Sequence, residues 1–296
     1  MKFNDREIDF ISEITGRFES VNWYDAWKNQ PAAIDWLYEP IIERGTVNAL
    51  FGLPGLGKSL LALDIALTLV RDGHSVVYID EENRIIDLVE RLQDMGATPD
   101  ELDNLVLYSF QSLPSLDTPE GGWALLALVM AAEADLVVLD TTTRMVDGRE
   151  NDSDTFLKLH KNSLARLKNR KVSVLRLDHP GKNAAQGQRG SSAKDGDVDT
   201  IWKLTTSASG FTLELTRTKS RSGHGEVDKL AVTRHKKPLW HELGTADSSK
   251  ILKQLDLSGV PRTAGRPACR AALDAAGVSV SNVVLSRIIK DRKAGA

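Results

Sequence analysis

The sequence lacks the features that would tie it to a membrane, a disulfide framework or a zinc site. It has one cysteine in 296 residues, Cys269, with no neighbouring cysteine or histidine at metal-ligand spacing. We expect this cysteine to be a packing residue. No stretch approaches the roughly 20 consecutive apolar residues of a membrane helix, and the opening residues MKFNDREIDF contain no apolar segment of a secretory signal. The expectation is a cytoplasmic protein without membrane contact.

A large excess of charge of one sign is also missing. The formal net charge of -3 argues against a protein that coats nucleic acid with its whole surface. The charges are nevertheless segregated, with nine Lys and Arg against three acids over residues 248–296, and five bases against nine acids over residues 1–45. Because 41% of the residues are apolar, the chain can form one large core and a small second domain.

From residue 46 onward, short apolar segments alternate with longer periodic segments, a pattern typical of a parallel sheet with crossover helices. Strands are expected at 46–51, 75–80, 105–110, 135–140 and 172–178, and helices at 59–70, 85–95 (closing at Gly96), 123–134 and 156–168. After Gly196 the residues alternate in a way that favours antiparallel strands extending the sheet at one edge. The pattern predicts a doubly wound α/β core.

Three parts are predicted along the chain: an N-terminal segment of helix and loop (1–45), an α/β domain (46–245) and a basic helical C-terminal domain (246–296). In the first part Trp23 and Trp27 stand one helical turn apart, and Trp36 follows. Aromatic residues at this spacing usually pack in a core, which is the expectation here. The alternative is that this segment flanks a nucleotide base or a neighbouring subunit.

The strongest motif is GLPGLGKS, residues 52–59, placed between an expected strand and an expected helix as the Walker A pattern requires. Its glycines let backbone N–H groups face phosphates, and the helix N-terminus adds its dipole. Lys58 is expected to bind the β and γ phosphates and the Ser59 hydroxyl to bind Mg²⁺. The predicted ligand is therefore ATP with Mg²⁺, held by Gly52, Leu53, Pro54, Gly55, Leu56, Gly57, Lys58, Ser59 and Leu60.

Acidic residues follow two of the expected strands. LVVLD ends in Asp140, at the edge of the sheet where the phosphates would lie, which is Walker B chemistry and adds a carboxylate for the magnesium ion. YIDEEN supplies Asp80, Glu81 and Glu82, of which at least one is expected to orient the attacking water. The alternative for these acids is simple stabilisation of the next helix N-terminus.

With these residues the chain resembles the RecA-like motor ATPases, and most closely their RepA and DnaB-type hexameric helicase branch, over about residues 36–234. In that superfamily the water-activating glutamate follows the strand after the P-loop helix, which selects Glu82, with Glu81 in reserve. LDTTTRMVDGRENDSD looks like the Walker B strand and following loop of the same branch, which implies Asp140 and, more remotely, Glu150.

The resemblance extends to LDHPGK and the loop after it. In the family a histidine at this strand end senses the γ-phosphate, which implies that role for His179. The polar loop PGKNAAQGQRGSSAKDGDVD carries Lys182, Arg189 and Lys194, and flexible basic loops can follow a phosphate backbone. The corresponding family loop lines a central DNA channel. The alternative is a surface loop without a ligand.

TKSRSGHG resembles the KxRxG element of DnaB-type proteins, in which a lysine and an arginine reach the γ-phosphate bound by the neighbouring subunit. Lys219 and Arg221 match it. An arginine that reaches the neighbouring subunit in this way, an arginine finger, implies a homo-oligomer, in this family a hexamer. It typically raises the rate of hydrolysis by about 10³ to 10⁵-fold. The alternative is a basic hairpin edge that discourages strand aggregation.

The basic tail RPACRAALDAAGVSVSNVVLSRIIKDRK has helix-turn-helix spacing, with a turn at Gly277 and Ser281 or Asn282 capping the second helix. Val284, Leu285, Ile288 and Ile289 are expected to face inward. Arg287, Lys290 and Arg292 are expected to be exposed for DNA. Docking to a protein is the alternative for this helix pair.

Taken as an expectation, the function is an ATP-driven helicase or translocase on single-stranded DNA in phage or plasmid replication. A RecA-like recombinase that forms filaments has almost the same ATPase core and is the nearest rival. A DNA-binding regulator or loader that uses ATP as a switch is the third possibility.

Overall fold

The computed structural model describes residues 4–17, 20–29, 34–149, 152–179, 196–206, 213–221, 227–244, 248–278, 280, 285, 288, 289 and 292. The chain divides into two compact units, residues 1–35 and residues 36–296. The first unit contains helices α1 (Asp5–Arg17) and α2 (Trp23–Lys28). Within the described part, no helix is long and apolar enough to cross a membrane.

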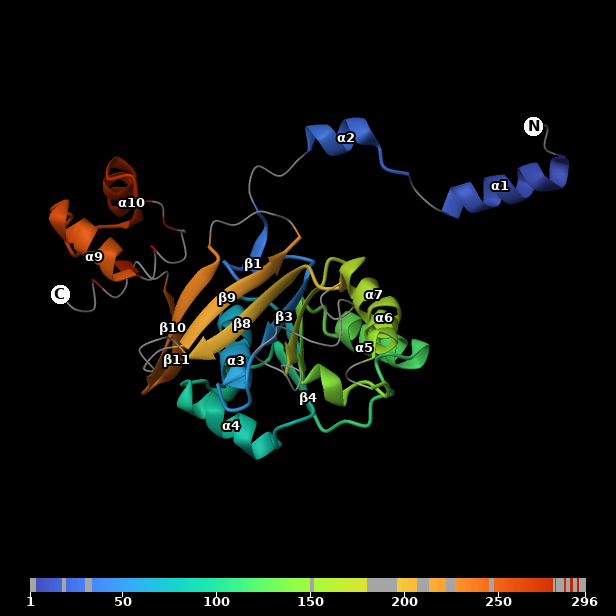
Figure 1. The fold of residues 1–296 in the computed structure, drawn as a ribbon, viewed down its shortest axis with the longest axis horizontal. Helices are drawn as coiled ribbons and strands as arrows, with labels where there is room; N and C mark the ends of the chain where they lie inside the picture. The colour runs from blue at the N-terminus through green and yellow to red at the C-terminus, as the bar shows by residue number, and fades with distance from the viewer. Residues whose placement is uncertain are drawn as a thin grey trace. The chain divides into compact units, whose positions relative to one another are not determined.

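A nine-stranded sheet with the order β11-β10-β9-β8-β3-β7-β6-β4-β5 is the frame of the second unit (Figure 1). The strands from β8 to β5 in this order are parallel: β8 (Thr200–Thr206), β3 (Val47–Phe51), β7 (Ser173–Asp178), β6 (Leu136–Asp140), β4 (Val76–Asp80) and β5 (Leu105–Ser109). Antiparallel pairing with β8 adds β9 (Leu213–Ser220), β10 (Lys229–Lys236) and β11 (Leu239–Gly244). The predicted α/β core with antiparallel edge strands is confirmed.

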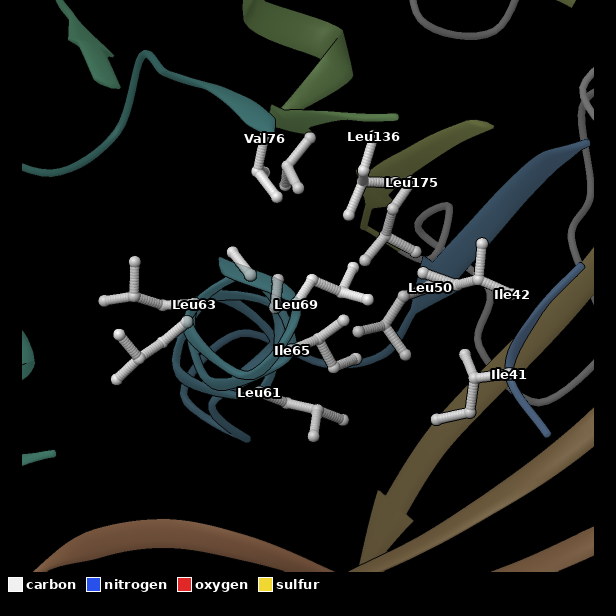
Figure 2. Close-up of a cluster of buried hydrophobic side chains, with 14 of the residues drawn as sticks. Ile41, Ile42, Leu50, Leu61, Leu63, Ile65, Leu69, Val76, Leu136 and Leu175 are labelled. Atoms are coloured by element: carbon white, nitrogen blue, oxygen red, sulfur yellow. The ribbon is translucent and has the colours of Figure 1, made fainter. Parts of the chain in front are cut away.

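The sheet is buried on both faces because alternate residues of its apolar strands point to opposite sides. On one side Leu50, Val76, Leu136 and Leu175 pack with helix α3 (Lys58–Arg71), as Figure 2 shows. Helix α4 (Ile85–Asp94) contributes Leu88 to the same cluster and closes at Gly96, whose φ is +70°. The P-loop helix is therefore embedded in core.

The opposite face of the sheet is covered by α5 (Pro119–Ala131), α6 (Ser153–Leu159) and α7 (Ala165–Lys168), the last two joined by a π-helical turn, η3 (His160–Leu164). Helix α5 begins earlier than the expected residue 123 because Thr118 caps it, accepting a hydrogen bond from the Gly121 N–H at 3.1 Å, and Pro119 occupies its first turn. Single turns of 3₁₀ helix complete the unit at η1 (Pro99–Glu101) and η2 (Thr142–Arg144).

The expectation of helix and loop throughout residues 1–45 is wrong for its last part. Residues 36–43 contain two short antiparallel strands, β1 (Trp36–Tyr38) and β2 (Ile42–Glu43). Ile41 and Ile42 lie in the same buried cluster as the P-loop helix, and the Trp202 indole donates a hydrogen bond to the Ile41 carbonyl at 3.1 Å. These residues thus belong with the α/β unit.

The expectation that Trp23 and Trp27 pack in a core is also wrong. They are 75% and 78% exposed, and Tyr24 between them is 79% exposed. The helix that carries them is only six residues long, and none of its residues is buried. Its start is held by Asn22, whose side chain accepts hydrogen bonds from the N–H groups of Tyr24 and Asp25.

The C-terminal region forms its own small core around helices α9 (Ser248–Leu257) and α10 (Arg266–Ala275). Gly277 ends α10 with φ +68°, and the Val278 N–H returns to the Leu273 carbonyl at 2.9 Å. The predicted inward residues Leu285, Ile288 and Ile289 are buried, as is Cys269, while Val284, Ser281 and Asn282 lie outside the described residues. The packing prediction is confirmed for Leu285, Ile288, Ile289 and Cys269.

Candidate functional site

Residues 52–57 form the loop that joins β3 to α3 at the carboxyl edge of the sheet. Gly55 and Gly57 have φ values of +79° and +88°, which glycine adopts without a steric penalty. A Cβ at Gly52 would stand 2.6 Å from the Leu204 carbonyl oxygen, so β8 approaches too closely for a side chain. The tip of the loop, Leu53, Pro54 and Gly55, is exposed, whereas Leu56, Ser59 and Leu60 are partly buried. This backbone at a helix N-terminus suits an anion.

The Lys58 side chain folds back onto the start of the loop that precedes it. Its Nζ donates to the Gly52 carbonyl at 2.8 Å and lies 3.3 Å from His179 Nδ1. Burial lowers the pKa of Lys58, while the negative charges of Glu82, Asp140 and Asp178 act in the opposite direction. Among the described residues no carboxylate is hydrogen-bonded to its ammonium group. The lysine therefore carries a desolvated charge without a direct counter-ion, which a phosphate would supply.

Asp140 is the last residue of β6 and is fully buried. The Tyr78 hydroxyl donates a hydrogen bond to its Oδ2 at 2.9 Å. Burial and then the neighbouring charge of Asp80, its partner in the parallel register, raise the pKa of Asp140 to about 6, against hydrogen bonds from Ser59 and Tyr78. Ionising the Asp140 carboxylate in this place therefore costs free energy, which a nearby cation would offset.

The donor set here fits a magnesium ion. In the described part of the chain, Asp140 Oδ1 and the hydroxyls of Thr141 and Thr142 are buried without a hydrogen-bond partner. Mg²⁺ prefers oxygen ligands and takes several from water and nucleotide phosphates. The described residues contain no cluster of three or more His, Cys, Asp or Glu side chains suited to a metal. The protein would therefore offer Ser59 and Asp140, with the phosphates completing the coordination.

The three acids at the carboxyl end of β4, Asp80, Glu81 and Glu82, have different surroundings. Asp80 accepts hydrogen bonds from the N–H groups of Glu82 at 2.8 Å and Asn83 at 2.6 Å, so it fixes the shape of the turn. Glu81 lines a pocket with Gln111 and Arg144, and burial raises its pKa. Glu82 Oε2 lies 3.9 Å from His179 Nε2. Glu82 is the acid that faces both the loop lysine and the histidine.

His179 follows the last residue of β7, which pairs directly with the P-loop strand. A lysine only donates, so the contact with Lys58 makes Nδ1 of His179 the acceptor and leaves the N–H on Nε2, toward Glu82. Asp178, at the strand end, forms a buried ion pair with Arg176 at 2.9 Å. The histidine thus bridges the predicted phosphate-binding lysine and the predicted water-activating glutamate.

Sequence reasoning missed Arg234. It lies on β10 and donates a hydrogen bond from Nη2 to the Leu56 carbonyl of the P-loop at 2.7 Å. A Cβ at Gly57 would overlap its guanidinium, so the group sits directly on the loop backbone. The segment TRHKKP resembles any basic edge strand, and only the pairing of β10 with β9 and β11 brings this arginine to the site.

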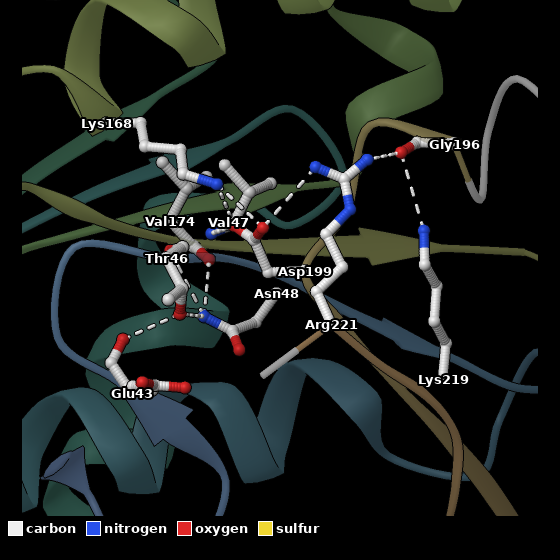
Figure 3. Close-up of polar contacts among 10 residues, drawn as sticks. All are labelled: Glu43, Thr46, Val47, Asn48, Lys168, Val174, Gly196, Asp199, Lys219 and Arg221. Atoms are coloured by element: carbon white, nitrogen blue, oxygen red, sulfur yellow. Dashed lines mark hydrogen bonds and ion pairs between the residues drawn. The ribbon is translucent and has the colours of Figure 1, made fainter. Parts of the chain in front are cut away.

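The predicted fingers Lys219 and Arg221 lie elsewhere, at the amino edge of the parallel strands. β9 runs antiparallel to β8, and Ser220 pairs with Thr200 at the start of β8, while the P-loop end of β3 pairs with Lys203. In Figure 3 both side chains contact the Gly196 carbonyl, Lys219 at 3.4 Å, and Arg221 Nη1 is 3.6 Å from Asp199. Neither residue can serve the P-loop of its own subunit.

Several predicted residues cannot be placed. Lys182, Arg189, Lys194, Glu150, Arg287 and Lys290 lie outside the described residues. Arg292 is described, and its predicted exposure is wrong. Its side chain is 5% exposed, donates to Asp256 at 2.5 Å and also to the Val260 carbonyl at 2.9 Å. Arg292 therefore contacts Asp256 of α9 and the Val260 carbonyl instead of presenting its charge to a ligand.

The fold and the loop geometry define a class of protein, the P-loop proteins with a RecA-like fold. The solved structure described as the ATPase domain of G40P superposes with a TM-score of 0.53 and 15% sequence identity, covering 66% of this chain and 84% of that one. A family model described as an AAA domain, AAA_25, matches residues 13–185. The chain belongs to this AAA domain family.

Curated relatives match this chain over only part of their length. The DNA repair and recombination protein RadB of Methanobrevibacter smithii is 33% identical over 79 residues, which is 26% of this chain and 33% of the relative. RadB of Halobacterium salinarum is 30% identical over 136 residues, covering 43% of this chain and 54% of the relative. The chain thus spans about a third to a half of the relatives it matches.

Proposed function

We propose that this protein hydrolyses Mg²⁺-ATP at interfaces between its own copies and uses the energy to move on single-stranded DNA as a helicase or translocase. Lys58 binds the phosphates, Ser59 and Asp140 serve the magnesium ion, and Glu82 orients the attacking water. His179, between Lys58 and Glu82, responds to the γ-phosphate.

The observation that supports this most is the separation of two groups of charged residues. Lys58, Glu82, Asp140 and His179 meet at the carboxyl edge of the sheet, whereas Arg221 and Lys219 are at the amino edge. Lys219 and Arg221 could therefore act on transition-state charge only at the P-loop of another subunit. This arrangement favours an oligomer, which in the resembled helicase branch is a hexameric ring.

The test compares the wild-type protein with Lys58→Ala and with Lys236→Ala, which removes an exposed lysine of β10. We expect Lys58→Ala to lower ATP turnover by about 10²-fold or more, because the desolvated phosphate-binding charge is lost, and Lys236→Ala to have no such effect. Single-stranded DNA should stimulate the wild type and the Lys236 variant alone. Unchanged turnover in Lys58→Ala would contradict the proposed site.

A RecA-like recombinase is the second candidate, because the RadB relatives are described as DNA repair and recombination proteins. Electron microscopy with single-stranded DNA and a non-hydrolysable ATP analogue separates the two. Closed rings with strand displacement support the helicase, and filaments with strand exchange support the recombinase. A monomer indifferent to DNA would exclude both, and very slow turnover with sequence-specific duplex binding by residues 248–296 would indicate an ATP-switched regulator.

A further inference from the structure

Arg234 stands against the P-loop at the end of a chain of hydrogen bonds that begins on the P-loop helix. Asp64 of α3 accepts from His241, both from its backbone N–H at 2.6 Å and through Nδ1 at 3.0 Å. The Arg234 Nε–H then points to His241 Nε2 at 3.0 Å, and Arg234 reaches the Leu56 carbonyl at 2.7 Å. The chain of contacts returns to the loop from which α3 starts.

The sheet register fixes this arrangement. Arg234 and His241 are directly opposed in the antiparallel pair β10–β11. His241 has no exposed side-chain surface, and the Asp64 side chain is 13% exposed. Because an arginine can only donate, His241 must accept at Nε2 and therefore carries its hydrogen on Nδ1, facing the Asp64 carboxylate. Each member thus sets the orientation of the next.

The charge of Arg234 is not balanced by a direct partner. No carboxylate forms an ion pair with it among the residues that the structure describes, and desolvation lowers its pKa. A guanidinium has five N–H donors, and those on Nη1 take part in no hydrogen bond within the described part of the chain. A half-buried cation with free donors beside a phosphate-binding loop suits a phosphate oxygen.

We propose that Arg234 is a second phosphate-binding cation, supplied by the same subunit as Lys58 and held in place by His241 and Asp64. This inference rests on the proposed ATP site, and it adds to that site a phosphate-binding side chain from the β10–β11 hairpin. Nucleotide binding would then fix the hairpin to the P-loop, so the two would separate less readily in the nucleotide-bound protein.

The experiment measures equilibrium binding of Mg²⁺-ADP and Mg²⁺-ATP to Arg234→Lys and Arg234→Gln at low and high salt. We expect Arg234→Gln to weaken both affinities by roughly 10-fold at low salt, with the loss shrinking as salt screens the charge. Arg234→Lys should retain most of the affinity. Lys236→Ala, on the same strand, is the matched control, and thermal unfolding of each variant checks that it is folded.

The outcomes separate this inference from the proposed function. If Lys58→Ala abolishes binding while folded Arg234→Gln binds normally, the ATP site stands and the role of Arg234 is refuted. Equal losses in the Lys and Gln variants at all salt concentrations would mean that Arg234 only supports the loop, and would also overturn it. Asp64→Asn, which keeps the arginine but weakens its support, should give a smaller loss of affinity, and unchanged affinity there would refute the positioning by His241 and Asp64.

Discussion

The two edges of the parallel sheet differ in whether their acidic residues have cationic partners. At the amino edge two acids have close cationic partners: the partly buried Asp135 contacts Arg44 and His74, and the buried Asp199 contacts Lys168 and Arg221. At the carboxyl edge Asp140 has no cation within ion-pairing distance among the described residues, and Lys58 is surrounded by carboxylates without bonding one. The charges of these two acids are balanced within the protein, whereas those of Asp140 and Lys58 would be balanced by the proposed nucleotide and magnesium ion.

Under the proposed function, the paired acids of the amino edge serve stability and the unpaired charges of the carboxyl edge serve chemistry. Asp199 receives hydrogen bonds from Lys168 at 2.6 and 2.7 Å and from the Val47 N–H at 2.9 Å, so it anchors the start of the P-loop strand. Asp140 stays desolvated beside Asp80, an arrangement that costs folding free energy. A strained electrostatic environment of this kind is typical of functional sites.

The largest expected effect concerns the two glutamates of the carboxyl edge. Glu82→Gln should reduce ATP turnover by about 10² to 10⁴-fold, because the variant cannot take a proton from the attacking water, while ATP binding persists. Glu81→Gln is the matched control, since Glu81 instead faces Gln111 and Arg144. Steady-state hydrolysis and equilibrium binding measure both. A larger loss in Glu81→Gln would reverse the assignment.

Asp140→Asn should stabilise the nucleotide-free protein while it impairs magnesium-dependent hydrolysis. The pKa of Asp140 is raised to about 6, so the folded state binds the proton more tightly than the unfolded state. The contribution of Asp140 to the stability of the wild type is therefore most favourable below the ordinary carboxyl pKa and is lost as pH rises through about 6. Asparagine avoids this loss, which amounts to about 3 kcal/mol once the carboxylate is ionised.

Urea unfolding of the wild type and Asp140→Asn at several pH values checks this prediction. The free-energy difference between them should be small near pH 4 and reach its full size by about pH 7. A variant that is less stable than the wild type at pH 7, or a difference that is constant with pH, would show that the Asp140 charge costs no folding free energy.

A smaller effect is expected at the amino edge. Asp199→Asn should destabilise the protein by about 1 to 2 kcal/mol, because the charged hydrogen bonds from Lys168 and the ion pair with Arg221 are weakened in a nearly buried place. Asp228→Asn is the matched control, since Asp228 pairs with Arg217 but is 77% exposed, and should change stability by at most about 0.5 kcal/mol. Equal losses would remove the contrast between paired and solvated acids.

Local patterns predicted most of the parallel core. Apolar strands followed by Gly52, Asp80, Asp140 and His179 place their ends at one edge wherever the strands are parallel, and the structure has them there. That inference needs only the spacing of apolar residues, the parallel direction of the strands and the P-loop motif. The start of α5 was missed because the cap Thr118 and Pro119 precede the apolar pattern on which the expectation was based.

Features that depend on distant contacts could not be predicted. Arg234 reaches the P-loop only through the pairing of β10. Arg292 is buried because it forms an ion pair with Asp256 of α9, which is 36 residues away in the sequence. Nothing in the spacing of basic residues distinguishes these two from solvated ones. Trp23 and Trp27 show the opposite error, because helical spacing indicates a shared face but not what covers it.

The position of the P-loop strand in the middle of the sheet has a consequence for biosynthesis. The hydrogen bonds that join β3 to its neighbours span 126 residues to β7 and 152 residues to the residue before β8. Synthesis proceeds from the N-terminus, and long loops must close before such contacts form. The phosphate loop therefore leaves the ribosome well before the strands that flank it, so the proposed ATP site can form only after most of the α/β unit has been translated.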